Sequence, residues 1–89
     1  MNFEEDWNIP TVISGRRVLF FWRFDPGLAS RTQVFGLAIV EGPRGTVALY
    51  TCEDDWMPMA ATRHADIEAA MRVATSRYVG ADPTWEPTF

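Results

Sequence analysis

Three groups of side chains in this sequence have the types that chemistry needs: one histidine, one cysteine and a run of three acids. His64 has Asp66 two residues away, and on a helix that spacing points the two side chains to different sides. Cys52 is followed by Glu53 and Asp54, whose charges oppose the thiolate that a nucleophilic cysteine requires. We therefore expect an exposed histidine, a cysteine buried in the core and no catalytic site. A reactive thiol, or a disulfide between two copies, is the alternative for Cys52.

The acidic run Glu53, Asp54 and Asp55 is the one cluster whose oxygens could bind Mg²⁺ or Ca²⁺. Adjacent strand residues alternate sides, however, and the spacing differs from that of an EF-hand loop. We therefore predict no metal site and no cofactor. The run is expected to be a solvated strand end, or an acidic surface that meets a basic partner.

Length and composition predict one small domain over residues 1–89, with an irregular arm at 1–10 and an extended tail at 80–89. The chain has 47% hydrophobic and 22% charged residues and a formal net charge of −4. This charge argues against binding to nucleic acid or to anionic lipid. The N-terminus lacks the basic-then-apolar order of a signal peptide, and a single cysteine excludes an internal disulfide. Both observations favour a cytoplasmic protein. No membrane span is expected, because the longest uncharged run, Thr32 to Val40, is too short for a spanning helix.

Three strands are expected over residues 16–24, 33–41 and 46–53, and a short additional strand over residues 11–14. In the first, period-two alternation places Val18, Phe20, Trp22 and Phe24 on one face. Residues 25–32 are read as a long connecting loop. The Gly-Pro-Arg-Gly sequence at 42–45 predicts a type I turn that joins the second and third strands as a hairpin.

The second strand has small residues on one face, among them Gly36 and Ala38. A glycine in a strand needs a packing reason, so we expect another element, the helix, to approach this face closely.

One amphipathic helix is expected from about Ala60 or Arg63 to Val79, after an irregular connector at 56–59. Thr62 is the expected N-cap and Gly80 the expected stop. The core-facing stripe at 100° per residue comprises Ile67, Ala70, Met71, Ala74 and Tyr78. The predicted fold is therefore α+β: a small antiparallel meander of three to four strands with one C-terminal helix packed on one face.

The acidity, the small size and four Trp in 89 residues favour a non-enzymatic protein-binding module, such as an inhibitor, an immunity or anti-defence protein, or an accessory subunit. Its partner would be a protein, neutral or basic. The expected contact residues are Trp7, Glu53, Asp54, Asp55, Trp56 and Trp85.

Two alternatives stay open. One is a small enzyme or ligand-binding domain with a pocket between helix and sheet, or at an interface between subunits. The pocket would be walled by Trp22, Tyr50 and Tyr78, with Asp54, His64 and Arg23 as polar groups. The other is a homodimer held by sheet edges or exchanged tails.

Overall fold

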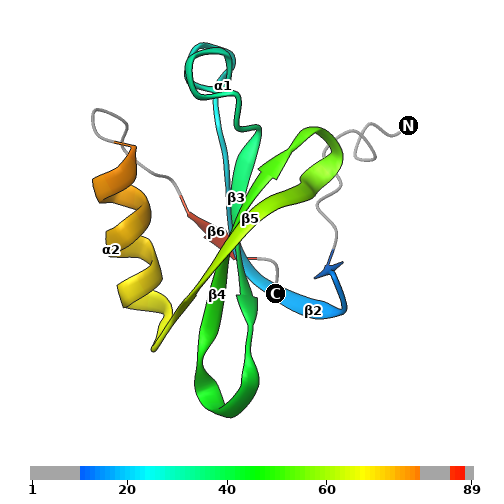
Figure 1. The fold of residues 1–89 in the computed structure, drawn as a ribbon, viewed down its shortest axis with the longest axis vertical. Helices are drawn as coiled ribbons and strands as arrows, with labels where there is room; N and C mark the ends of the chain where they lie inside the picture. The colour runs from blue at the N-terminus through cyan, green and yellow to red at the C-terminus, as the bar shows by residue number, and fades with distance from the viewer. Residues whose placement is uncertain (1–10, 79–84, 88–89) are drawn as a thin grey trace.

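The computed structural model describes residues 11–78 and 85–87, and its centre is an antiparallel sheet (Figure 1). The sheet has six strands in the order β1-β2-β3-β4-β5, and β6 also pairs with β2. The strands are β1 (Val12–Ile13), β2 (Arg16–Arg23), β3 (Gly36–Glu41), β4 (Val47–Glu53), β5 (Met57–His64) and β6 (Glu86–Pro87). The helices are α1 (Pro26–Thr32) and α2 (Ile67–Arg77). The predicted α+β class with an antiparallel sheet is confirmed, but the sheet has more strands than expected and a second helix is present.

The segment predicted as a loop between the first two long strands forms α1. Asp25 is its N-cap, and the Asp25 carboxylate accepts a hydrogen bond of 2.8 Å from the Leu28 amide. Pro26 occupies the first turn, where its missing N–H costs nothing. Leu28 anchors the helix in the core at 6% exposure. The Asp-Pro pair was therefore a helix start and not merely a break in the strand.

The β3–β4 hairpin is confirmed, although its turn differs from the predicted type. Arg44 and Gly45 both have positive φ, at 57° and 79°, and the Thr46 amide donates to the Pro43 carbonyl at 3.1 Å. Two central residues with positive φ make a type I′ turn, whose twist matches that of the flanking strands. The reversal is thus centred one residue later than expected.

The largest correction concerns residues 57–64, which form β5 instead of a connector and a helix start. Thr62 pairs with Leu49 of β4 and does not cap a helix. The N-cap of α2 is Asp66, whose carboxylate accepts a 2.8 Å hydrogen bond from the Ala69 amide. In Figure 1, β5 runs diagonally across the centre of the view and leads directly into α2.

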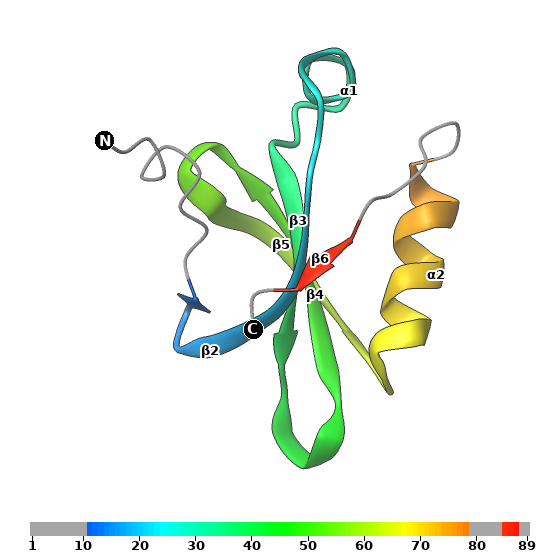
Figure 2. The ribbon, with the colours of Figure 1, turned by 180° about the vertical axis from the view of Figure 1, so that it is seen from behind.

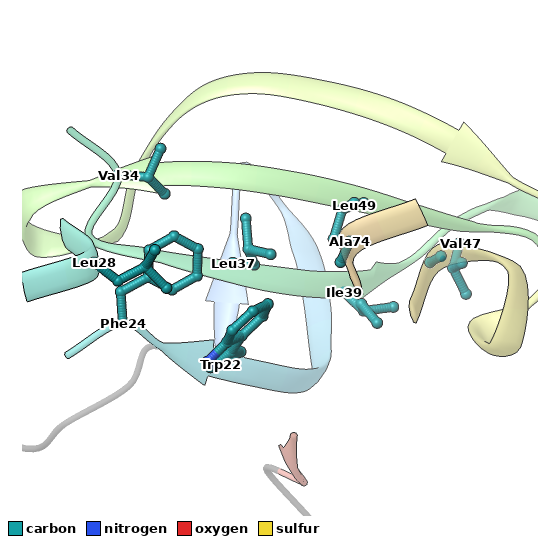
Figure 3. Packing of buried hydrophobic residues seen from close by; sticks show 10 residues of the cluster. Trp22, Phe24, Leu28, Val34, Leu37, Ile39, Val47, Leu49 and Ala74 are labelled. Atoms are coloured by element: carbon teal, nitrogen blue, oxygen red, sulfur yellow. The ribbon is translucent and has the colours of Figure 1, made fainter. Parts of the chain in front are cut away.

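Buried side chains form two clusters on opposite faces of the sheet. We name them the helix-side cluster and the far-side cluster, because Ala70 and Ala74 of α2 belong to the first. The helix-side cluster comprises Trp22, Phe24, Leu28, Val34, Leu37, Ile39, Val47, Leu49, Ala70 and Ala74 (Figure 3). The far-side cluster comprises Ile13, Val18, Ala38, Val40, Tyr50, Cys52 and Trp56. The predicted α2 stripe is confirmed, since Ile67, Met71 and Tyr78 also pack on the helix-side cluster.

A bulge in β2 changes the face on which its side chains lie. Val18 pairs with Val40 and Phe20 pairs with Ile39, so Leu19 is an extra residue without an opposite partner. Val18 therefore belongs to the far-side cluster, whereas Trp22 belongs to the helix-side cluster. The uniform alternation predicted for this strand was wrong.

The two ends of the molecule carry different elements. Figure 1 shows α1 at one end and the β3–β4 turn at the other. Seen from behind in Figure 2, β6 lies next to β2, with which it pairs as an antiparallel strand. The expected arm at 1–10 and the residues from Val79 to Thr84, including the predicted stop at Gly80, lie outside the described residues.

Candidate functional site

The most exposed of the long strands is β5, the last strand in the sheet order. Every residue from Met57 to Arg63 is exposed, and only His64 is half-buried. Among the described residues β5 pairs with β4 alone, so the backbone groups on its other side are open to pairing. Met57 and Met59 are 58% and 48% exposed, which is unusual for large apolar side chains.

The two halves of β5 differ in their readiness to pair. Pro58 offers no N–H, and Met59 is an extra residue where the register with β4 shifts between Thr51 and Cys52. Prolines and bulges prevent an edge strand from pairing with another chain. The second half, Ala60–His64, pairs regularly with β4 and contains neither a proline nor a bulge. Within the described part of the chain, the edge that is open to pairing is therefore this second half.

The segment that leads from β4 into β5 is acidic. Glu53 and Asp55 are both exposed, as expected for a solvated strand end. The chain turns between β4 and β5 through the short 3-10 turn η3 (Asp54–Trp56), where Asp55 and Trp56 have φ values of 63° and 58°. Nowhere in residues 11–78 and 85–87 do three His, Cys, Asp or Glu side chains gather as a metal site.

The Trp56 side chain is buried at 5% exposure. Its ring therefore packs inside the fold beneath the turn between β4 and β5, and it is not open to a partner. Its ring packs edge-on against Phe21 and Phe35, with centroids 5.9 and 5.3 Å away. It also lies against Gly36. The face of β3 that carries Gly36 and Ala38 therefore packs against Trp56. The expectation that the helix packs against this face was wrong.

The other predicted contact residues are dispersed. Trp85 is half-buried and packs edge-on against Trp22, with ring centroids 5.7 Å apart, on the helix side of the sheet. Trp7 and the Asp54 side chain lie outside the described residues. The structure thus brings Glu53 and Asp55 together with β5 and places Trp85 on a different face.

The pocket considered between helix and sheet does not form from the expected walls. Trp22 and Tyr78 are in edge-on contact, with centroids 6.2 Å apart, on the helix side. Tyr50 belongs to the far-side cluster, on the opposite face of the sheet. One hollow cannot be walled by all three rings.

The residues with catalytic side chains do not converge either. Cys52 is fully buried, and this burial raises the pKa of its thiol to about 12, so the nucleophilic thiolate is scarce at neutral pH. His64 ends β5 instead of lying in the first turn of a helix, and its Nε2 is 2.8 Å from the hydroxyl of Thr62. The buried-core prediction for Cys52 is confirmed.

No family model, curated protein or solved structure matches this chain. Function is therefore inferred from the residues and their arrangement. Neither described helix has the length and apolar character needed to cross a bilayer.

Sequence reasoning missed Met57 and Met59 as candidate contacts because it read their segment as a connector. A signal was available in the uncharged run from Trp56 to Thr62, which contains Pro58 and follows a strand. Such a run fits an edge strand, where proline is tolerated.

Proposed function

We propose that this protein is a non-enzymatic binding module that recruits an extended segment of another protein to the free edge of β5. The observation that carries the proposal is the exposure of β5 from Met57 to Arg63 at the end of the sheet order. Addition of a strand to such an edge is a recurring mode of peptide recognition, in which backbone hydrogen bonds provide affinity.

The backbone of Ala60–His64 supplies the pairing groups. In an antiparallel sheet, residues alternate in the direction of their hydrogen bonds, so about half of these residues direct their N–H and C=O away from β4. Five residues are enough for a strand of ordinary length. The added segment would extend the sheet beyond β5.

The side chains at the start of β5 define the partner. Met57 and Met59 give an adaptable apolar surface, which suits thioether side chains. Glu53 and Asp55 lie beside them and favour cationic groups. In an antiparallel arrangement the C-terminal end of the partner segment lies at this acidic end. The partner is therefore an uncharged extended segment followed by basic residues, which agrees with the net charge of −4.

NMR titration with a designed peptide tests the proposal. The probe is a peptide of alternating Val and Thr that ends in two Arg, and its matched control ends in two Glu. We expect saturable shifts of the Ala60–His64 amides with the first peptide and weaker binding of the second. Absence of shifts at these amides, or equal binding of both peptides, contradicts the proposal.

Three variants locate the surface. Met57→Lys and Met59→Lys place charges on the exposed apolar positions and should weaken binding of the Arg-ended peptide. Val12→Lys is the matched control, since Val12 is 55% exposed on β1, at the far end of the sheet order. If the β5 amides instead shift with the concentration of the protein alone, β5 pairs with a second copy and the proposed partner is wrong.

A further inference from the structure

A hollow of about 210 Å³ lies on the far side of the sheet, between the β3–β4 turn and β5. Its lining includes Ala48 and Tyr50 of β4, Arg63 of β5 and Arg16 at the start of β2. Tyr50 is 7% exposed and belongs to the far-side cluster, so this side of the hollow is a packed surface.

The strand register explains why two arginines from distant parts of the sequence line the same hollow. Arg63 is opposite Ala48, Ala48 is opposite Val40, and Val40 is opposite Val18, which makes a row across four strands. Arg16 precedes Val18 by two residues and therefore shares its face. Arg63 ends the row on one side and Arg16 lies beside its other end. Ala48, next to Arg63, is small and leaves room between the two arginines.

Arg16 is held over this face by a backbone contact. Its Nη1 donates a 3.2 Å hydrogen bond to the carbonyl oxygen of Glu41, at the end of β3. The guanidinium thus lies about two strand spacings, roughly 10 Å, from the backbone of Arg63. Arg63 is exposed and has the reach to close this distance from the other side.

The charges in the hollow are all of one sign. Among the described residues that line it, two are arginines and none is acidic. Two like charges that face one hollow repel each other, and an anion between them removes the repulsion. Arginine is also the side chain whose planar donors match the oxygens of carboxylates and phosphates. The contrast with the net charge of −4 makes this cationic hollow distinctive.

We propose that this hollow binds a small oxyanion, a molecule with a carboxylate or phosphate group, between Arg16 and Arg63. The volume of about 210 Å³ suits a ligand of the size of a small metabolite. Binding here does not depend on strand addition at β5, so it goes beyond the proposed function.

The experiment is an NMR titration with inorganic phosphate and, in a separate arm, with succinate, both at ionic strength held constant with sodium chloride. Saturable shifts at the Ala48, Tyr50 and Arg63 amides support the site. The stronger of the two arms identifies the preferred oxyanion. Shifts that do not saturate, or that spread over all basic residues, overturn the proposal.

Arg16→Gln and Arg63→Gln should each weaken binding at least about tenfold, since each removes a charged hydrogen-bond donor. Arg17→Gln is the matched control, because it removes the same charge from the adjacent residue, which points to the opposite side of β2. Equal weakening by Arg17→Gln would show general charge screening and overturn the site. Met57→Lys should leave oxyanion binding unchanged, which separates this result from the test of β5.

Discussion

Trp56 lies so close to Gly36 that the glycine cannot carry a side chain. A Cβ built on Gly36 would be 2.7 Å from Cη2 of Trp56 and 2.8 Å from the carbonyl oxygen of Trp22. The second contact is with backbone, which cannot rotate away. This pair joins the start of β3 to the turn that leads into β5, and it therefore positions the proposed binding edge.

Gly36→Ala should lower the free energy of unfolding by about 1–3 kcal/mol, the usual cost of overpacking a filled core. Urea denaturation measures the change. Gly27→Ala is the control, because a Cβ there meets only Asp25 Oδ1 at 3.4 Å, an ordinary contact. Gly27 lies in α1, where alanine is the better helix former, so this variant should be neutral or slightly stabilising. Equal losses of unfolding free energy for both variants would show that the contact between Trp56 and Gly36 does not constrain the residue at position 36.

Trp56→Ala should cost about 3–5 kcal/mol of stability, as expected for removal of a large buried ring that packs on Phe21 and Phe35. A residue that served only as a partner contact would leave stability nearly unchanged. The double variant with Gly36→Ala should lose less than the sum of the single losses, because the new methyl group enters the space of the ring. Additive losses would contradict the contact. Thermal and urea melts of the four proteins complete this cycle.

Asp66→Ala should destabilise the protein by about 1 kcal/mol, because its carboxylate caps the N-terminus of α2. Thr62→Ala is the matched control: Thr62 is exposed on β5 and caps no helix, so its loss should be small. The two free energies of unfolding decide between the helix start at Asp66 and the earlier start that the sequence suggested. A larger loss for Thr62→Ala would favour the earlier start.

Cys52 should resist alkylation in the folded protein and react quickly after unfolding. Burial raises its pKa from 9.0 to about 12, so the folded state retains the proton that the unfolded state releases. Between pH 9 and pH 12 the unfolded state therefore binds fewer protons, and stability falls as pH rises. The slope reaches at most about 1.4 kcal/mol per pH unit.

Iodoacetamide labelling with and without urea measures the protection, and urea melts at several pH values measure the slope. The control is Cys52→Ala, whose stability should fall less steeply above pH 9 than that of the unchanged protein. Rapid labelling of the folded protein at pH 8 would contradict the burial of the thiol.

The sequence by itself determined the elements whose signals are local. The β3–β4 hairpin follows from two apolar runs around a Gly-Pro-Arg-Gly turn, and the buried stripe of α2 follows from its helical spacing. The exposure of Glu53 and Asp55 was predicted for the same reason, because charged residues at a strand end remain in water. The periodicity of buried residues depends on residues that are close in the sequence, so it can be predicted before the fold is known.

Only the tertiary structure decided which segments pair and on which face each side chain lies. Thr62 resembles a helix cap, but its pairing with Leu49 of β4 places it in a strand. One extra residue at Leu19 moves Val18 to the far side of the sheet. The register of most of these strands also depends on contacts between residues distant in the chain, and local periodicity alone does not specify it. The free edge of β5 and the hollow between Arg16 and Arg63 both arise from those long-range pairings.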